Sequence, residues 1–285
     1  MLGDLHVHTV YSDGSYTLHE ALGKARMRGI AYISFTDHDT LAQNAEASAL
    51  APEYGVAYVP GIEISCRNPA TSRKVHILGY CCSPGHEKLD YLCAATRDER
   101  DFFSRASVRA LAGKGWPIDV DEVLEDAGRP AVLYKQHVMA LLVKKGLASG
   151  IYGPEYESIY GPDGIAGGEI AYADPIEALR AVLDSGGIPV LAHPGQYDSW
   201  GLVEKLVDAG LAGIEFYHES HDEDDYERIM AITARHPELV LTGGSDDHGS
   251  LGSLHVMGDI RAPFACLDSL KAVVGPAIGN ISMKE

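Results

Sequence analysis

The sequence predicts an α/β fold in which strands and helices alternate along most of the chain. Short apolar segments end in polar residues, and helix-type patterns lie between several of them. Such alternation is typical of parallel β-α-β units. With 285 residues, the chain is long enough for one large α/β domain, or for a medium domain with a smaller one inserted. The segments interpreted as buried strands are LHVHT, AYISFTDHD, VAYVPGIEIS, KVHILGY, IPVLAHP, AGIEFYHES and LVLTGGSDDHG.

Helix patterns occupy five of the intervals between these strands. Glycine is common immediately after a helix C-terminus, and a glycine follows four of the five patterns. The sequence therefore predicts both the helices and their ends. The helices are expected at residues 18–28, 41–53, 175–184, 202–208 and 224–235, with closing glycines at Gly29, Gly55, Gly186 and Gly210.

The alternation breaks between residues 83 and 172. Long helical stretches occur there, followed by a passage rich in Gly, Pro and Tyr. We expect residues 1–82 and 173–285 to form the α/β domain, with 83–172 as a helical insertion. Loops of this length usually have a role, so the insertion is expected to act as a lid or a substrate wall, with a connector of no further role as the alternative.

Composition excludes several classes of protein. A net charge of −18 repels nucleic acid over most of the surface, so long duplex DNA is not an expected partner. No apolar run is long enough to cross a membrane, and polar residues come too early for a signal peptide, which predicts a cytoplasmic location. The five cysteines lack zinc-type spacing and are expected to be reduced thiols: Cys66, Cys81, Cys82, Cys93 and Cys266.

Imidazoles and carboxylates stand near the ends of nearly all the predicted strands. His6 and His8 are two residues apart, so on a strand they point to the same face, and Asp246 and His248 repeat that spacing. One such residue is usually a hydrogen-bonded core histidine or a turn cap. Burying many of them without partners would be costly, and metal ions would satisfy them together. The further candidates are Asp13, His38, Glu63, His76 and His193.

The donor types indicate which metals would bind. Neutral imidazoles with carboxylates and no thiolates suit Zn²⁺, Mn²⁺ or Fe²⁺, and the candidates outnumber the ligands that one ion takes. Two or three divalent ions are therefore expected. Carboxylates able to bridge, such as Glu63 or Asp246, favour ions about 3.5–4 Å apart, which is the arrangement that activates water against phosphate esters.

Six motifs carry a family resemblance. In order they are DLHVHTVYSDG, FTDHDT, GIEIS, HILGY, LAHPG and GGSDDHG, and together they resemble the polymerase and histidinol phosphatase (PHP) family of metal-dependent phosphoesterases. This resemblance implies a distorted, TIM-like (β/α)7 barrel with a trinuclear metal site at its C-terminal face. It assigns His6, His8, Glu63 and Asp246 to a first ion, Glu63, His76 and His193 to a second, and Asp13, His38 and His248 to a third.

The resemblance also implies a reaction. Asp13 in YSDG is similar to members that act on nucleotides, whereas histidinol phosphatases often have a histidine near that position. The most similar subgroup removes the 3′-phosphate of nucleoside 3′,5′-bisphosphates, and some of its members trim RNA from the 5′ end. The expected nucleophile is a metal-bound hydroxide held by Glu63 and Asp246. His218 is a candidate acid for the leaving oxygen, or alternatively a hydrogen-bonding support for the ligands.

The insertion supplies the candidate substrate contacts. Arg129 matches the arginine of a GRPH motif that reaches substrate in this subgroup, but Ala131 replaces its histidine. Lys135 or His137 could compensate, with two solvated helix positions as the alternative. A small phosphorylated substrate, most simply a nucleotide, is therefore expected.

Three other functions are weighed against this one. Histidinol phosphate or short oligonucleotides could be the substrate of the same site. A metal-stabilised binding module without turnover is a different class, and the intact ligand set argues against it. A dinucleotide-binding Rossmann domain is set aside because no GxGxxG follows the first strand.

Overall fold

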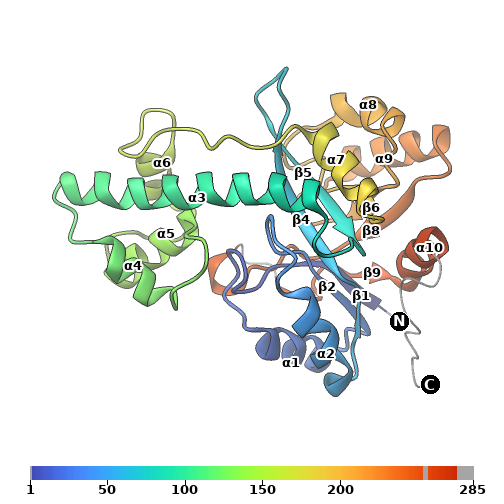
Figure 1. Ribbon diagram of the computed structural model, residues 1–285, viewed down its shortest axis with the longest axis horizontal. Coiled ribbons are helices and arrows are strands. Elements are labelled where there is room, and N and C mark those ends of the chain that lie inside the picture. Colours follow the sequence, from blue (N-terminus) through green and yellow to red (C-terminus); the bar gives the residue numbers. More distant parts are fainter. Residues whose placement is uncertain (1, 253–255, 275–285) are drawn as a thin grey trace.

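The computed structural model describes residues 2–252 and 256–274, and nine strands in them form two sheets (Figure 1). One sheet contains β1 (Leu2–Val7), β2 (Tyr32–Phe35), β3 (Ala57–Tyr58) and β9 (Ala262–Pro263), in the order β3-β2-β1-β9. The other contains β4 (Gly61–Arg67), β5 (Lys74–Tyr80), β6 (Ile188–Leu191), β7 (Gly213–Tyr217) and β8 (Val240–Gly243), in that order. The fold is therefore mixed α/β, as the sequence predicts.

The expectation of parallel β-α-β units holds for β1 to β3 and for β6 to β8, whereas β4, β5 and β9 pair antiparallel with a neighbour. β1, β2 and β3 pair in parallel, as do β6, β7 and β8. β5 is antiparallel to both β4 and β6. Only residues 68–73 connect β4 to β5, and a link this short allows a hairpin but not the crossover that parallel pairing needs.

Two isolated bridges join the sheets where their parallel strands end. Val7 at the end of β1 pairs with Asp247 beyond β8, and His38 beyond β2 pairs with Glu63 in β4. These bridges bring residues from both sheets to one rim. Among the described residues the strand ladders form two sheets rather than one closed ring, so the seven-stranded barrel stays a prediction.

Helices cover the outer faces of the sheets. All five predicted helices are present within a few residues of the expected bounds, and the four closing glycines have positive φ of 68° to 106°. The helices are α1 (Leu18–Met27), α2 (Asn44–Tyr54), α7 (Pro175–Asp184), α8 (Val203–Asp208), preceded by a 3₁₀ turn (Trp200–Leu202), and α9 (Glu223–Arg235). A second 3₁₀ turn (Gly249–Leu251) follows β8, and α10 (Phe264–Val274) ends the described chain.

Four helices lie between β5 and α7, in the segment that the sequence predicts to be a helical insertion. Its helices are α3 (Glu87–Gly113), α4 (Val120–Asp126), α5 (Lys135–Lys144) and α6 (Pro154–Tyr160). They share their own apolar cluster, which includes Leu111, Val123, Leu142 and Ile159. The passage expected to be a loop contains α6, because Pro154 stands in a first helical turn, where its fixed φ and missing N–H favour a helix.

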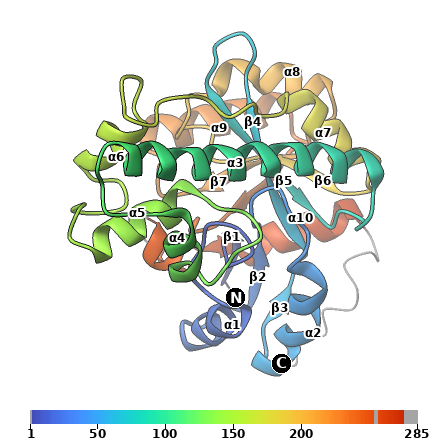
Figure 2. The ribbon, with the colours of Figure 1, turned by 60° about the vertical axis from the view of Figure 1, so that its left-hand side comes forward.

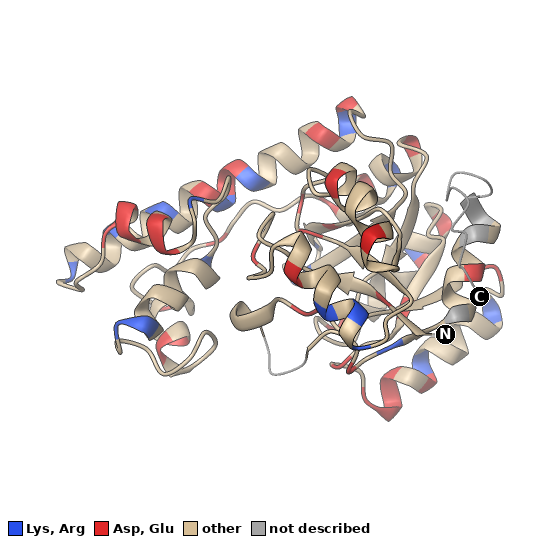
Figure 3. Cartoon of the chain, turned by 90° about the horizontal axis from the view of Figure 1, so that it is seen from below, with Lys and Arg blue, Asp and Glu red and all other residues tan. Residues whose placement is uncertain are grey.

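Helix α3 connects the insertion to the sheets. Its 27 residues correspond to a length of about 40 Å. Lys88 near its start pairs with Asp184 of α7, and Arg100 further along pairs with Asp39 beyond β2. In Figure 2 this helix crosses in front of the sheets, and Figure 3 shows that it carries charges of both signs. α3 thus runs from one end of the sheets to the rim and beyond.

Three further predictions from the sequence concern membrane spans, cysteines and a domain boundary. Across the described segments, every helix is too short or too polar to cross a membrane. All five cysteines are free. The predicted α/β domain boundary at residue 285 lies outside the described residues.

Candidate metal centre

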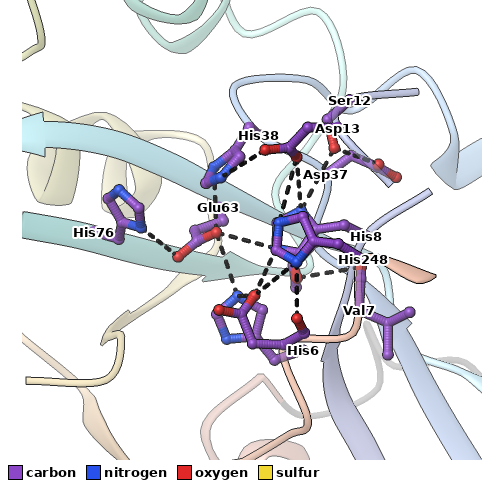
Figure 4. A network of polar contacts seen from close by, with 12 residues as sticks. His6, Val7, His8, Ser12, Asp13, Asp37, His38, Glu63, His76 and His248 are labelled. Carbon is purple, nitrogen blue, oxygen red and sulfur yellow. Dashed lines mark hydrogen bonds and ion pairs between the residues drawn. The ribbon is translucent and has the colours of Figure 1, made fainter. Parts of the chain in front are cut away.

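The nine side chains predicted as metal ligands meet at the rim where the parallel strands end, and Figure 4 labels all of them except His193 and Asp246. Seven of the nine are buried, and Asp246 and His248 are partly exposed. They come from β1 and the loop after it, the turn after β2, strands β4 and β5, and the segments after β6 and β8. The nine are His6, His8, Asp13, His38, Glu63, His76, His193, Asp246 and His248.

Glu63 lies at the centre of this group. Its Oε1 is 2.7 Å from Nδ1 of His76 and 2.9 Å from Nε2 of His193. The other carboxylate oxygen, Oε2, faces three further histidines. Oε2 lies 3.2–3.3 Å from ring nitrogens of His6, His8 and His38.

Two further carboxylates flank Glu63. Asp246 Oδ1 is 3.1 Å from Nε2 of His8 and 3.4 Å from Nε2 of His6. Asp13 Oδ1 is 3.4 Å from Nε2 of His248. The Asp13 carboxylate also lies 3.8 Å from ring nitrogens of His8 and His38. Each of the three carboxylates thus contacts several imidazoles, and some imidazoles contact more than one carboxylate.

Local backbone geometry sets these positions. Because β5 runs opposite to its neighbours, His76 near its start reaches the same rim as residues at the ends of the parallel strands. Asp246 has a φ of 52°, which is uncommon for a residue other than glycine, although Asp adopts it more often than most residues. Gly244 passes so close to β1 that a Cβ there would lie 2.4 Å from Cβ of His6.

Burial and charge act together on the titration of the site. Burial raises the pKa of Glu63, but the surrounding imidazoles outweigh it and hold that pKa well below the usual range; the same holds for Asp13 and Asp246. Burial lowers the pKa of His193, which favours the neutral imidazole that binds metals. For His8, burial is outweighed by Asp246 and Glu63, which raise its pKa to about 10. In the absence of metal, protons shared between imidazoles and carboxylates thus offset the negative charge of the carboxylates. Divalent ions would displace these protons.

The donor atoms fit metal ions. Buried polar atoms almost always have hydrogen-bond partners, yet four atoms facing the centre have none in the described structure: Nε2 of His6, Nε2 of His8, Oδ1 of Asp13 and Oδ1 of Asp246. Ligand atoms within 4.8 Å of one another form four groups. These are His6, His8, Glu63 and Asp246; His8, Asp13, His38 and His248; His38, Glu63 and His76; and His6, His193 and Glu215.

Three supporting residues were missed by sequence reasoning. Glu215 is fully buried, with Oε1 3.0 Å from Nδ1 of His6, while its Oε2 accepts the backbone N–H of His193 at 2.9 Å. Asp37 accepts hydrogen bonds from the backbone and side chain of Thr9. Gln136 of α5 donates to Asp13 Oδ2 at 3.0 Å. The sequence did contain a signal for Glu215, which stands in the otherwise apolar strand GIEFY. Because an unpaired buried charge is costly, a carboxylate there indicates a buried partner.

The predicted substrate contacts lie in three different settings. Arg129 forms an exposed ion pair with Glu125 of α4. His137 is buried and accepts the backbone N–H of Tyr134 at 3.2 Å, so it is tied to the start of α5. Lys135 is half-buried against aromatic rings. The alternative of a solvated helix position is therefore wrong for His137, whereas Lys135 keeps part of its surface in solvent.

His218 lies beside the carboxylates. Its Nδ1 accepts the backbone N–H of Ser220 at 3.1 Å, which leaves the proton of the neutral ring on Nε2. That Nε2 is buried, has no hydrogen-bond partner among the described residues, and lies 3.7 Å from Oδ2 of Asp246.

Comparisons with known proteins agree with this geometry. The PHP domain model matches residues 4–140. A phosphoribosyl 1,2-cyclic phosphate 1,2-diphosphodiesterase from Eggerthella lenta is 41% identical over 263 residues, covering 92% of this chain and all of the relative. The chain belongs to the PHP family. It is a metal-dependent phosphoric ester hydrolase of that family, so a binding module without turnover is no longer an alternative.

Two other relatives of this PHP protein cover most of its length. A 3′,5′-nucleoside bisphosphate phosphatase from Chromobacterium violaceum is 29% identical over 250 residues, which is 86% of each chain. A crystal structure described as a metal-dependent phosphoesterase from Bifidobacterium adolescentis superposes with a TM-score of 0.86 at 27% identity, covering 95% of each chain. The similarity therefore extends through the insertion.

Proposed function

We propose that this PHP protein hydrolyses a phosphate ester on a ribose that carries a second phosphate, with a phosphoribosyl cyclic phosphate as the first candidate substrate. The observation that carries the proposal is the set of unpartnered ligand atoms around Glu63 and Asp246, in a buried site with room in its donor set for more than one ion. The candidate substrate comes from the relative that is 41% identical and matched over its whole length.

The first set of ligands coincides with one of the four clusters, the second rests on the contacts of Glu63 with two rings, and the third lies within the cluster that also contains His8. His6, His8, Glu63 and Asp246 would hold one ion, Glu63, His76 and His193 a second, and Asp13, His38 and His248 a third. Mn²⁺, Fe²⁺ or Zn²⁺ suits these nitrogen and oxygen donors. When bound, such ions polarise the phosphate and lower the pKa of water. Glu215 would keep the ring of His6 in the orientation that metal binding needs, and would hold His193 in place through its backbone N–H.

His218 would hold the proton for the leaving oxygen. The backbone N–H of Ser220 occupies Nδ1, so the neutral ring presents the Nε2 proton toward Asp246 and the centre of the site. Burial opposes protonation of the ring, but Asp246 and Glu215 raise its pKa above the usual value. In the protonated ring, Nδ1–H can donate to Ser220 Oγ at 2.8 Å instead of accepting the backbone N–H, and this charged form is suited to general acid catalysis.

A nucleoside 3′,5′-bisphosphate is the second candidate substrate. It is supported by the 29% identical relative and by tyrosines on the insertion. Tyr152 is 54% exposed, and its hydroxyl accepts from Gln136, which also donates to Asp13. The ring of Tyr156 lies 5.4 Å from that of Tyr152, so an aromatic surface lies close to the candidate ligands and could stack on a base.

The two sheets are also consistent with a single barrel. We propose that β1, β2 and β4 to β8 form one distorted seven-stranded barrel, with residues 83–172 inserted between its strands as a wall of the site. Its support is the pair of bridges at Val7 and His38, which lie where the two sheets would close on each other.

One assay tests the substrate proposal. Protein with measured metal content is incubated with a phosphoribosyl cyclic phosphate, nucleoside 3′,5′-bisphosphates, histidinol phosphate and short RNA, and the products are quantified. We expect fastest turnover of the cyclic phosphate. Faster turnover of histidinol phosphate or RNA by metal-loaded protein would refute the proposal, and faster turnover of a bisphosphate would select the second candidate.

A further inference from the structure

Four cationic side chains gather where the β4–β5 hairpin meets the insertion, and we call them the basic cluster: Arg67, Lys74, Arg100 and Lys135. Arg67 ends β4 and is paired directly with Lys74, the first residue of β5. Arg100 comes from α3, and Lys135 begins α5. Two sheet residues and two insertion residues are thus brought together by the tertiary fold.

Aromatic rings line the cluster. Lys135 Nζ lies 4.8 Å from the ring centre of Phe103 and 4.7 Å from that of Tyr160. Arg100 lies over Tyr134 at 4.7 Å, and both arginines lie 5.5 Å from the ring centre of Tyr172. These rings hold the stems and planes of the cations in place without neutralising their charge.

Carboxylates balance only part of the charge. Arg100 pairs with Asp39 at 3.0 Å, and Arg67 pairs with the exposed Glu169. Neither lysine forms an ion pair with any residue in the described part of the chain. The buried Nε atoms of Arg67 and Arg100 also lack hydrogen-bond partners there, although only 8% of the Arg100 surface is exposed.

The cations repel one another. Burial and the charges of Lys74, Arg100 and Arg67 lower the pKa of Lys135 to about 8. A cluster of like charges destabilises the fold unless an anion occupies it. Lys74 is exposed to solvent, but Lys135 is half-buried and still has no carboxylate partner in the described chain. In a protein with a net charge of −18, this unpaired charge points to an anionic ligand.

The basic cluster adjoins the metal centre by two routes. Lys74 Nζ lies 5.8 Å from the ring centre of Tyr197, whose ring is 5.2 Å from His76 and 5.5 Å from His193. Arg100 donates to Ser65 Oγ at 2.7 Å, and Ser65 lies 3.4 Å from Nδ1 of His38. A small ligand held at the metal ligands could therefore extend toward these cations.

We propose that the basic cluster binds the second phosphate of the substrate, the one on the ribose carbon remote from the ester that is hydrolysed. This inference rests on the proposed function and specifies it further. Both candidate substrates carry a 5-phosphate on ribose, so one subsite would serve either. Arg129, paired with Glu125 at the surface, is replaced in this role by Lys135 and Lys74.

Matched substrates test the subsite. The pairs are a nucleoside 3′-phosphate with its 3′,5′-bisphosphate, and ribose 1,2-cyclic phosphate with its 5-phosphate. Lys135→Met and Lys74→Met should each lower kcat/KM at least about tenfold for the member that carries the 5-phosphate, and leave the other member unchanged, because a charge-assisted contact is lost. Lys88→Met, an exposed lysine on α3, is the matched control. Equal losses on both members, or no loss on either, would overturn the subsite.

A binding measurement distinguishes a failure of the phosphate subsite from a failure of the proposed function. Calorimetry with ribose 5-phosphate on metal-free protein should show binding that both variants weaken and Lys88→Met preserves. If the wild-type protein hydrolyses neither pair, the proposed function fails while the binding result still decides the subsite. Equal affinity of the wild type and the Lys135→Met variant would refute the subsite even if turnover is present.

Discussion

Glu215 contacts His6 through a side-chain hydrogen bond of 3.0 Å between Oε1 and Nδ1, in a position with no solvent exposure. Its second oxygen accepts the N–H of His193 at 2.9 Å. One carboxylate therefore connects two candidate ligands that are distant in sequence. Residues that orient metal-bound imidazoles in this way affect metal affinity without touching the ion.

Glu215→Gln is predicted to weaken metal binding by about 10–100-fold, because the amide keeps the shape of the carboxylate but not its charge. Affinity is measured by competition with a chromogenic chelator. Glu204→Gln, at an exposed position paired with Arg235, is the control and should leave affinity unchanged. Equal affinities of the two variants would contradict the role of Glu215.

His8→Ala and Asp246→Ala are predicted to abolish both metal binding and turnover. Both residues contribute atoms to the central cluster and contact each other at 3.1 Å. Metal content by elemental analysis and phosphate release are measured on the same samples. Full turnover by either variant would refute the ligand assignment.

Chelation of the metals is predicted to lower thermal stability as well as activity. Each ion bound at a hundredfold excess over its Kd adds about 2.7 kcal/mol to the free energy of unfolding. Removal also leaves mutually repelling carboxylates around Glu63 that only shared protons offset. Differential scanning calorimetry with and without chelator checks this, and readdition of Mn²⁺ should restore the original Tm.

Gly244→Ala is predicted to destabilise the protein by about 1–3 kcal/mol and to weaken metal binding, because the new methyl group would overlap the Cβ of His6. Gly150→Ala is the matched control, since no atom lies within 4 Å of a Cβ there. Denaturant unfolding and metal titration measure the two effects. A Gly244→Ala variant as stable as the control would show that β1 and this segment are not tightly packed.

The KM for a substrate with a 5-phosphate is predicted to rise as pH increases above about 8. Burial, Lys74 and the two neighbouring arginines lower the pKa of Lys135 to about 8 from its ordinary 10.5, so the cation is lost in that range. Between these values the unfolded chain binds more protons than the native one, so the contribution of Lys135 to stability increases with pH. Lys135→Arg should flatten the KM profile, and a parallel rise for the substrate without 5-phosphate would contradict the assignment.

The sequence predicted the helices and the nine clustered side chains well, because periodicity and buried polar residues are local signals. It predicted the position of His76 for an incomplete reason. That residue stands near the start of β5 and reaches the rim only because the strand is reversed, which depends on the short hairpin pairing with β4. Strand direction is a property of the pairing partner, and the pattern of KVHILGY is the same in either direction.

The substrate contacts were less predictable than the metal ligands. Arg129 was chosen by motif, but its side chain pairs with Glu125 at the surface. Lys74 and Arg100 gave no signal, since a single lysine before a strand or a single arginine in a long helix is usually solvated. Their meeting depends on how α3 packs across the sheets, which no local pattern encodes.

Reversal of β5 has a consequence for how such an enzyme diversifies. Because that strand ends at Tyr80, opposite the rim, the chain returns along α3 before it reaches the side of the candidate metal centre. The candidate metal ligands and the helices α4 to α6 therefore belong to separate stretches of sequence that α3 joins. Under the proposed function, changes in length or side chains within α4 to α6 would alter which ester is accepted while leaving the candidate metal ligands intact, so new specificities could evolve without loss of the hydrolytic chemistry.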